Sequence, residues 1–251
     1  MYQIPELKKY PKLFHAFSTK EDGNMANSIL GNLSDFKKVM ATRERFLSKI
    51  GVDINQCVCM WVTHGCEVIE VSEKSVGLSM RNYEKALKVD GLLTNKRGIY
   101  LFLLIADCLP IILYDPLKEA IGLIHAGWKG TDLNVSKKAV ERMINLYRTN
   151  PKDLVVGFGP AARKDSYKKE DPSQKSDPKW SGFIEPIGSN KYKVDFVGLC
   201  KKQLIDVGVL EKNIFDSKID TVKDKCFFSH TRERNLPLRK QGRFACVIGL
   251  L

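Results

Sequence analysis

The chain has 251 residues, of which 43% are hydrophobic and 28% are charged, and its formal net charge is +12. This length allows a full core in one domain, and this composition excludes disordered, fibrous and membrane-bundle proteins. The basic charge is compatible with RNA or with phosphorylated small molecules as partners. The basic residues are spread along the chain without an RNP-like motif, a zinc finger or a basic helix, which argues against a nucleic-acid partner.

The start of the chain and its apolar stretches give no sign of export or of a membrane span. Residues 1–14 carry Glu6 and two prolines rather than a basic start followed by an apolar stretch. The longest apolar region, residues 99–114, contains Asp107 and Pro110 and is shorter than the ~20 residues of a spanning helix. Seven cysteines, an odd number, favour reduced thiols over a disulfide framework. We therefore expect a soluble, cytoplasmic protein.

The first predicted element is a helix that Ser34 caps and that runs to about Ile50, with apolar residues at i, i+3 and i+4 spacing. Arg43 falls inside this apolar stripe. A guanidinium on a core-facing side must find a partner or reach water, so Arg43 either forms a structural contact or extends into a pocket.

Strands and two further helices follow. The second helix is predicted from Thr131 to Tyr147, before Asn150-Pro151, and the third covers residues 196–207, where Gly208 ends it. Several of the predicted strands are unbroken apolar runs, which is typical of strands buried on both faces. This mixture predicts an α/β or α+β fold in one domain, residues 1–251. The predicted strands are residues 57–63, 91–94, 99–106, 111–114, 120–124, 154–158, 225–229 and 244–250.

A polar tract interrupts this pattern at residues 164–181, where two Asp-Pro pairs punctuate a run of lysine, serine and aspartate. Because apolar segments resume on both sides, we interpret the tract as an excursion from one domain rather than as a linker. It is either a lid or a solvated loop.

Three residues with metal-ligand side chains directly follow predicted apolar strands: His64, Cys108 and His125. Strand ends can present side chains to a shared pocket, so these three could converge. Two imidazoles and a thiolate suit zinc and leave its fourth position open. Taken singly, each residue is also consistent with a satisfied core histidine or a small buried hydrophobe.

The turn Gly127-Trp128-Lys129-Gly130-Thr131 leads into the second predicted helix and could offer backbone N–H groups to a phosphate. It lacks the spacing of a Walker A loop, and an ordinary capped turn fits it equally well. Cys57, Cys59 and Cys66 lack the paired spacing of structural zinc sites, so we interpret them as core or surface thiols.

Short motifs are spread over almost the whole chain: Phe17-Ser18-Thr19, Arg43, Thr63-His64-Gly65, Asp90-Gly91-Leu92-Leu93-Thr94, Ala106-Asp107-Cys108-Leu109-Pro110-Ile111, His125-Ala126-Gly127-Trp128-Lys129-Gly130-Thr131, Gly157-Phe158-Gly159-Pro160, Phe227-Phe228-Ser229-His230 and Gly242-Arg243. In these motifs the chain resembles the laccase-domain family, also labelled multicopper polyphenol oxidoreductases. A family segment of the type Cys-Tyr-Glu corresponds here to Ser166-Tyr167-Lys168.

This resemblance implies a single α/β domain of layered sheets with outer helices, and a zinc ion on His64, Cys108 and His125. It also implies phosphorolysis of adenosine, inosine, guanosine and methylthioadenosine, with adenosine deamination as a further activity; bacterial relatives are linked to peptidoglycan precursor editing. Copper chemistry does not follow, because four histidines in total are too few for blue and trinuclear copper centres.

The resulting hypothesis is a zinc-dependent purine nucleoside phosphorylase. Arg43, Gly130 and Thr131 are its candidate phosphate-binding groups. Asp107 either moves a proton or orients the neighbouring ligand Cys108. Two alternatives stay open: an amidase with Cys108 as nucleophile and a histidine as base, and a basic binding module in which zinc is only structural.

Overall fold

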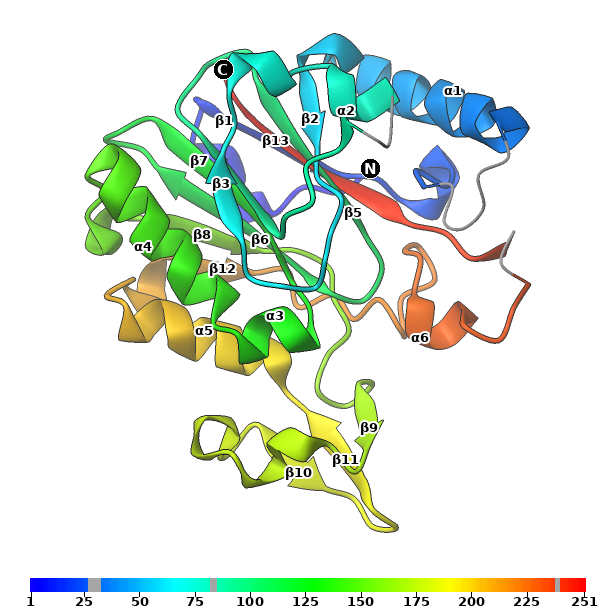
Figure 1. Ribbon diagram of the computed structural model, residues 1–251, viewed down its shortest axis with the longest axis vertical. Coiled ribbons are helices and arrows are strands. Elements are labelled where there is room, and N and C mark those ends of the chain that lie inside the picture. The colour runs from blue at the N-terminus through cyan, green and yellow to red at the C-terminus, as the bar shows by residue number, and fades with distance from the viewer. Residues whose placement is uncertain (27–32, 82–84, 238–239) are drawn as a thin grey trace.

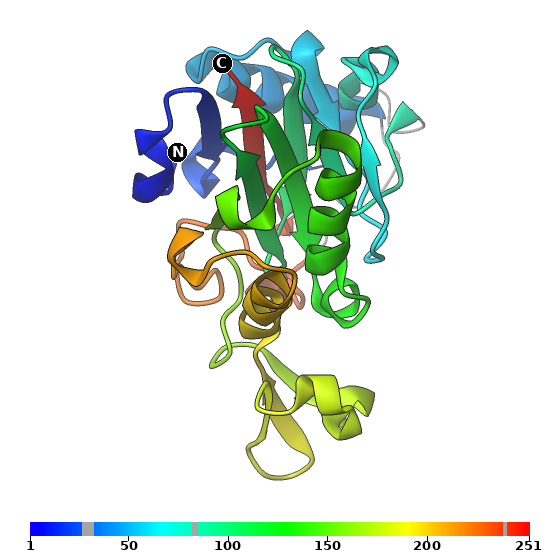
Figure 2. The ribbon, with the colours of Figure 1, turned by 90° about the vertical axis from the view of Figure 1, so that its left-hand side faces the viewer.

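The computed structural model describes residues 1–26, 33–81, 85–237 and 240–251, and it forms a mixed α/β single domain. Three β-sheets are present in this part of the chain, with helices on the outside of the two larger ones (Figure 1). Both termini lie in the half that contains the four-stranded sheet, and the smallest sheet projects from the opposite end (Figures 1 and 2). Among the described helices, none has both the length and the apolar character needed to cross a membrane.

The largest sheet has six strands in the order β12-β8-β6-β7-β4-β3. Its centre is the antiparallel pair of β6 and β7, every residue of which is buried. The predicted central strands are confirmed with small shifts of their ends, and β7 continues through His125. The bounds are β3 Val68–Glu70, β4 Gly91–Thr94, β6 Leu109–Asp115, β7 Ala120–Ala126, β8 Val155–Phe158 and β12 Ile214–Asp216.

The second sheet has four strands in the order β1-β13-β5-β2 and packs face to face on the first. Leu101 and Leu103 of β5 and Ile248 of β13 share one buried cluster with Ile112 of β6 and Leu123 of β7. Interdigitated apolar side chains of this kind are the main stabilising contact between two sheets. The bounds are β1 Leu13–Phe17, β2 Cys57–Cys59, β5 Tyr100–Ile105 and β13 Phe244–Leu250.

Helices cover the two outer faces and complete four layers. α4 (Val135–Tyr147) and α5 (Phe196–Asp206) pack on the six-stranded sheet through one buried cluster, and α5 confirms the third predicted helix. α1 (Leu33–Lys49) covers the four-stranded sheet and confirms the first, although the predicted cap, the side chain of Ser34, lies outside the described residues. The short helix α2 (Leu78–Arg81) contacts β2.

The predicted helix from Thr131 to Tyr147 is instead two helices, α3 (Trp128–Asp132) and α4. Asn134, between them, has a left-handed backbone conformation with φ of 61°. A left-handed residue cannot continue a right-handed helix, and asparagine adopts this conformation more readily than most residues. α3 follows β7 with only Gly127 between them, and the break at Asn134 separates it from α4.

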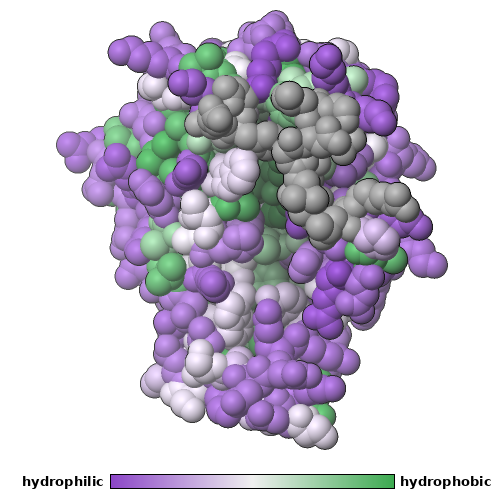
Figure 3. Space-filling view, turned by 45° about the vertical axis from the view of Figure 1, so that its right-hand side comes forward, coloured by the Kyte–Doolittle hydropathy of each residue, from purple (hydrophilic) through white to green (hydrophobic). Residues whose placement is uncertain are grey.

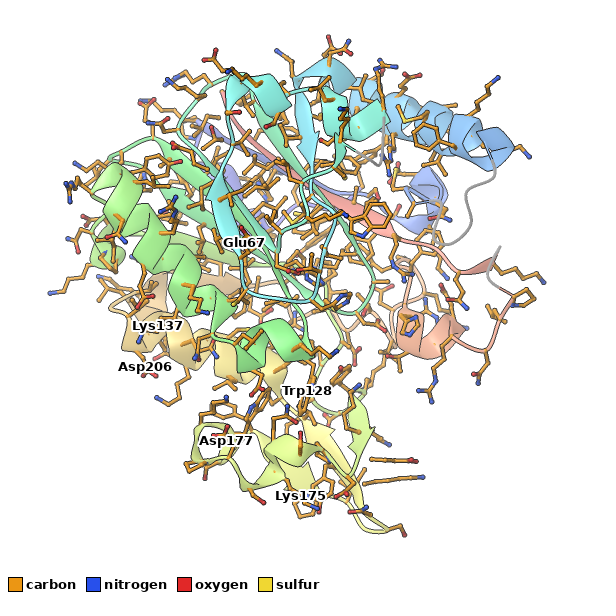
Figure 4. All side chains as sticks on the ribbon, in the orientation of Figure 1. Glu67, Trp128, Lys137, Lys175, Asp177 and Asp206 are labelled. Atoms are coloured by element: carbon orange, nitrogen blue, oxygen red, sulfur yellow. The ribbon has the colours of Figure 1, made fainter. Side chains whose placement is uncertain are left out.

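The polar tract is an ordered unit rather than an irregular loop. It contributes β9 (Lys168–Glu170) and two short 3-10 turns to a small antiparallel sheet with β10 (Ile184–Pro186) and β11 (Lys191–Val194). Trp180 is 1% exposed, stacks on Trp128 at 4.6 Å between ring centroids and donates to the Asp132 carboxylate. Figure 4 shows Trp128 extending from α3 toward this unit. Apolar anchoring explains why so polar a segment is ordered.

The strand predicted at residues 225–229 is wrong, because this segment is a turn and an extended stretch before α6 (His230–Glu233). Arg232 explains the difference. Its guanidinium donates to the backbone carbonyls of Thr221, Val222, Asp224 and Phe227, at distances from 2.5 to 3.1 Å. One side chain therefore holds the chain in a turn before and within the segment, and the carbonyl of Phe227 is bound without a neighbouring strand.

Candidate metal centre

Cys108 lies in the connection between the two large sheets. β5 ends at Ile105 in one sheet and β6 begins at Leu109 in the other, so residues 106–108 cross from sheet to sheet. Asp107 makes this crossing with φ of 77°, an uncommon conformation for a residue with a side chain. Its carboxylate accepts hydrogen bonds from the Thr221 hydroxyl at 2.7 Å and from the Thr231 N–H at 2.6 Å. Two donors thus fix the strained residue next to Cys108.

His125 is the next-to-last residue of β7 and is 2% exposed. Its ring Nδ1 lies 2.8 Å from an oxygen of Asp90, and its backbone N–H donates to the Asp90 carbonyl at 2.8 Å. Because a carboxylate only accepts, Nδ1 carries the proton, and the lone pair of Nε2 is left for a metal. This carboxylate–histidine arrangement is the usual support of a metal-binding imidazole.

His64 does not directly follow a strand, contrary to expectation, because β2 ends at Cys59, five residues earlier. It lies in an irregular loop with φ of 58° and is exposed. The same Asp90 positions this loop: its carboxylate accepts from the backbone N–H groups of His64 at 2.9 Å and Gly65 at 2.7 Å, and from the Thr63 hydroxyl. One carboxylate therefore holds two of the three candidate ligands.

The three predicted ligands do converge. One ligand atom from each of His64, Cys108 and His125 lies within 4.8 Å of the other two, and the two imidazole rings are perpendicular with centroids 5.0 Å apart. Gly127 leaves the space between them, since a Cβ there would lie 2.9 Å from the Cys108 sulfur and 3.6 Å from each histidine ring. Two nitrogens and one sulfur around a common point are a three-ligand set that fits a divalent metal such as zinc.

The charges in the centre favour the anionic forms of Cys108 and Asp90 and a positive charge at His125, which a metal ion could supply in place of a proton. Burial raises the pKa of Cys108, but attraction to His125 and hydrogen bonds from His125 and His64 lower it to about 6. Burial lowers the pKa of His125, whereas the negative charges of Cys108 and Asp90 raise it to about 9. Although burial raises the pKa of Asp90, hydrogen bonds from His125 and Thr63 lower it to about 2. At neutral pH the thiolate and the carboxylate are both charged, which is the state that a cation requires.

The structure places the other predicted site residues elsewhere. Arg43 is fully buried under the four-stranded sheet, donates to the carbonyls of Met25 at 2.8 Å and Met80 at 3.1 Å, and lies over the Phe102 ring. This location favours the structural alternative for Arg43. Its role in phosphate binding remains a prediction, without support from these contacts.

Gly130 and Thr131 lie in α3 behind the ligands. The Thr131 hydroxyl is buried and lies 3.2 Å from the Cys200 sulfur, and a Cβ on Gly130 would lie 2.8 Å from the Gly65 carbonyl. Gly130 therefore lets α3 approach the loop that carries His64. These contacts are structural, and a phosphate-binding role for the pair also remains a prediction.

Sequence reasoning missed three residues that surround the ligands. Asp90 stands within a recognised motif just before β4, but its role depends on the pairing of β4 with β7. The charges of Cys108 and Asp107 act on Tyr167 and on Arg243. Both residues stand in segments that the family resemblance singled out, but neither lies near Cys108 in sequence, so their proximity to it is seen only in the fold.

The chain matches the family model described as multi-copper polyphenol oxidoreductase laccase from residue 15 to residue 251. It belongs to this laccase-domain family. It is 29% identical over 218 residues to purine nucleoside phosphorylase YlmD of Bacillus subtilis (strain 168), covering 84% of this chain and 77% of the relative. It is also 29% identical over 232 residues to adenosine deaminase RL5 of an unknown prokaryotic organism, covering 86% of this chain and 88% of the relative.

Solved structures of laccase-domain relatives have the same fold. The hypothetical protein YfiH of Bacillus licheniformis superposes with a TM-score of 0.87 at 26% identity, over 97% of this chain and 95% of that chain. YlmD of Geobacillus stearothermophilus superposes with a TM-score of 0.85 at 26% identity, over 96% of this chain and 93% of that chain. The predicted fold of layered sheets with outer helices is therefore confirmed.

Proposed function

We propose that this chain is a zinc-dependent purine nucleoside phosphorylase that acts on adenosine, inosine, guanosine and methylthioadenosine, with adenosine deamination as a second reaction. The observation that carries the proposal is the convergence of His64, Cys108 and His125. Relatives named purine nucleoside phosphorylase and adenosine deaminase, similar over more than four fifths of this chain, support the two reactions.

The donor set supports zinc over the copper of the family's label. Zinc is commonly bound by imidazole and thiolate in a tetrahedral arrangement, and three protein ligands leave its fourth position open. Four histidines in the whole sequence are too few for blue and trinuclear copper centres. When bound, zinc supplies Lewis-acid chemistry, which polarises a substrate oxygen or lowers the pKa of a water.

The residues around the three ligands would hold them in the orientation and tautomer that binding of this ion requires. Asp90 fixes the tautomer of His125 and holds the backbone of His64, so it sets the direction of two ligands at once. Asp107 accepts two hydrogen bonds, which favours a positioning role over proton transfer. Its contacts with Thr221 and Thr231 tie the Cys108 turn to the C-terminal segment.

Phosphorolysis itself requires little covalent chemistry from the protein. An oxygen of hydrogen phosphate forms a bond to C1′ of the ribose while the bond from C1′ to the purine nitrogen breaks. The electron pair of that bond leaves with the purine, and the proton of the hydrogen phosphate ends on the purine nitrogen. The products are ribose 1-phosphate and the free base. The chain would act chiefly by holding phosphate and nucleoside in line and by excluding water.

The electrostatics of Cys108 favour one rival function. A thiol whose pKa is lowered to about 6, with two histidines beside it, also meets the requirements of a nucleophilic cysteine in an amidase. A chelator separates the two reactions, because nucleophilic cysteine chemistry survives removal of the metal and zinc catalysis does not.

The test of the proposed function is to incubate the purified chain, loaded with one equivalent of zinc, with adenosine in the presence and absence of phosphate. We expect adenine and ribose 1-phosphate only when phosphate is present, and inosine in either case. Turnover that persists after chelation, or no turnover of any of the four nucleosides, would contradict the proposal.

A further inference from the structure

Three segments that are distant in sequence meet the Asp107-Cys108 turn. Residues 230–231 reach it through the hydrogen bond from the Thr231 N–H to the Asp107 carboxylate, and Ala162 reaches it by donating to the Asp107 carbonyl at 2.8 Å. The third segment leads into β13, where Phe244 pairs with Ile105. In this antiparallel register Arg243 lies opposite Ala106, next to the turn. Each segment brings at least one basic side chain to the Cys108 side of the centre.

Arg243 is the best positioned of these side chains. Its backbone is fixed on both sides, because its N–H donates to Asn24 at 2.9 Å and its carbonyl accepts from Met25 at 3.0 Å. Its half-buried guanidinium donates to the Gly242 carbonyl at 2.8 Å. Burial lowers the pKa of Arg243, and the nearby negative charges of Cys108 and Asp107 raise it, which agrees with the location that the strand register gives it.

Lys169 approaches from β9 of the projecting unit. Its Nζ lies 5.1 Å from the centroid of the Tyr167 ring, which packs edge-on against Phe196 at 5.0 Å. Tyr167 and Lys169 are two residues apart, so they share one face of the strand, and Lys168 points to the other face. Burial raises the pKa of Tyr167, and so do the negative charges of Cys108 and Asp107, so Tyr167 lies within electrostatic range of the centre.

His230 completes the group at the start of α6, one residue before Thr231. Burial lowers its pKa, as do the positive charges of Arg243, Arg234 and Lys169, while Asp107 raises it. Arg243, Arg234 and Lys169 therefore disfavour the protonated form of His230, so its ring would contribute a hydrogen bond rather than a charge at neutral pH. The acidic groups near them have donors of their own: Asp107 accepts from two donors, and one oxygen of Glu233 pairs with Lys20 at 2.6 Å and Arg232 at 3.0 Å. This region has an excess of positive charge, which favours an anion.

Resting on the proposed function, we propose that Arg243, together with Lys169 and His230, binds the phosphate cosubstrate beside the metal centre. A planar guanidinium is suited to bidentate binding of a phosphate, and a lysine adds charge from a second side. This site takes the place of the predicted one at Arg43, Gly130 and Thr131, whose polar groups are engaged within the core. Figure 3 shows a strip of less polar residues between hydrophilic ones on one face of the molecule.

The location suits the reaction. A phosphate held by Arg243 is next to Cys108, so its attacking oxygen and the metal centre would act on the same nucleoside. The guanidinium would also hold the phosphate dianion against the ribose, whose C1′ becomes positively charged as its bond to the purine breaks. Arg243 would then be a catalytic residue in contact with substrate, whereas Asp107 is a positioning residue.

The test uses the zinc-loaded full chain and two measurements with inorganic phosphate: the phosphate KM in adenosine phosphorolysis, and the phosphate Kd by calorimetry. We expect Arg243→Gln to raise both values roughly tenfold to a hundredfold, which corresponds to the loss of a charged hydrogen bond. Arg243→Lys should keep part of the affinity, and Lys169→Gln should raise both values about twofold to fivefold. Zinc content and circular dichroism establish that each variant is folded.

Matched controls distinguish the site from general charge effects. Lys168→Gln removes the same charge on the other face of β9, and Arg142→Gln removes it from the exposed side of α4; both should leave phosphate Kd and KM unchanged. Folded Arg243→Gln with an unchanged phosphate Kd would overturn the inference even if phosphorolysis is established. So would a site that binds adenosine 5′-monophosphate through Arg243 but not inorganic phosphate. Conversely, phosphate binding that depends on Arg243 in a chain without phosphorolysis would refute the proposed function and sustain the phosphate site.

Discussion

His15 and His125 are equally inaccessible to solvent, at 1% and 2% exposed, yet their pKa values shift in opposite directions. His15 lies in β1 of the four-stranded sheet, where its ring Nε2 accepts a hydrogen bond from the Ile4 N–H at 2.9 Å. Burial lowers its pKa to about 4, and Lys8 contributes in the same direction. His125, in the six-stranded sheet, has a pKa raised to about 9 because Cys108 and Asp90 are beside it.

The difference teaches that burial alone does not identify a functional histidine. The backbone N–H beside His15 requires a neutral ring, so His15 is a satisfied core residue. The two negative groups beside His125 require a positive charge, which a proton or a metal ion supplies equally well. A buried histidine is a candidate metal ligand when negatively charged side chains are buried next to it.

The largest expected effect comes from removing the ring of each histidine in turn. His125→Ala should lower the zinc content to less than about a tenth of an equivalent, and phosphorolysis should fall below about 1% of wild type. His15→Ala should lower the temperature of unfolding and leave the zinc content at one equivalent. Atomic absorption and initial rates check both. Equal zinc contents in the two variants would refute the distinction between these histidines.

The next effect follows from neutralising the anion that the two ligand histidines share. Asp90→Asn keeps the shape of the side chain but removes its charge, so zinc affinity should fall about tenfold to a hundredfold. Thr63→Val is the matched control, because it removes only one hydrogen-bond donor to the same carboxylate. Competition with a chromogenic chelator measures both affinities. A loss in Thr63→Val as large as that in Asp90→Asn would argue for loop geometry rather than charge as the cause.

A smaller effect is expected at the glycine that leaves the space for the metal. Gly127 has an ordinary φ of −89°, so alanine is allowed by the backbone, but its methyl group would lie 2.9 Å from the Cys108 sulfur. Crowding of this kind typically costs about 1–3 kcal/mol, so Gly127→Ala should weaken zinc binding on the order of tenfold. The unfolding temperature of the metal-free chain should also fall, because the methyl group crowds the Cys108 sulfur with or without a metal. Unaltered zinc affinity in this variant would contradict a metal at this point.

The change with the smallest effect on the metal centre is the titration of His15, which acts on the free energy of unfolding. Its folded pKa of about 4 is below the unfolded value of 6.5, so the unfolded chain binds more protons between these two values. The stabilisation is fully present above pH 6.5 and is lost as the pH falls to about 4, by roughly 2–3 kcal/mol. Urea unfolding of wild type and His15→Asn across this range measures it. Parallel pH profiles of the two proteins would exclude His15 as the source.

Local sequence patterns were sufficient to predict the main strands and to place two of the three ligands at strand ends. The apolar runs before Cys108 and His125 belong to buried strands, so their ends could be located without the fold. The strand before His64 ends at Cys59, and the sequence of residues 60–63 gives no sign of this early end. His64 was therefore selected on a predicted strand end that the structure does not have, and the family motif Thr63-His64-Gly65 gave the better reason for including it.

Residues that act through long-range pairing could not be predicted in the same way. The apolar periodicity correctly predicted that Arg43 faces the core. It could not predict whether the guanidinium would enter a pocket or donate to backbone carbonyl groups, as it does. Arg243 lies near the Asp107-Cys108 turn only because β13 pairs with β5, and these two strands are more than a hundred residues apart in the sequence. The polar tract is ordered through Trp180, whose partner Trp128 belongs to another element. These contacts depend on topology rather than on local composition.

The most direct test of the account is X-ray absorption at the zinc edge of the purified chain loaded with one equivalent of zinc. We predict a first shell with one sulfur at about 2.3 Å and nitrogen or oxygen neighbours at about 2.0–2.1 Å. In Cys108→Ser the sulfur contribution should disappear. A shell without sulfur in the wild-type chain, or one with several sulfurs, would contradict a centre formed by His64, Cys108 and His125.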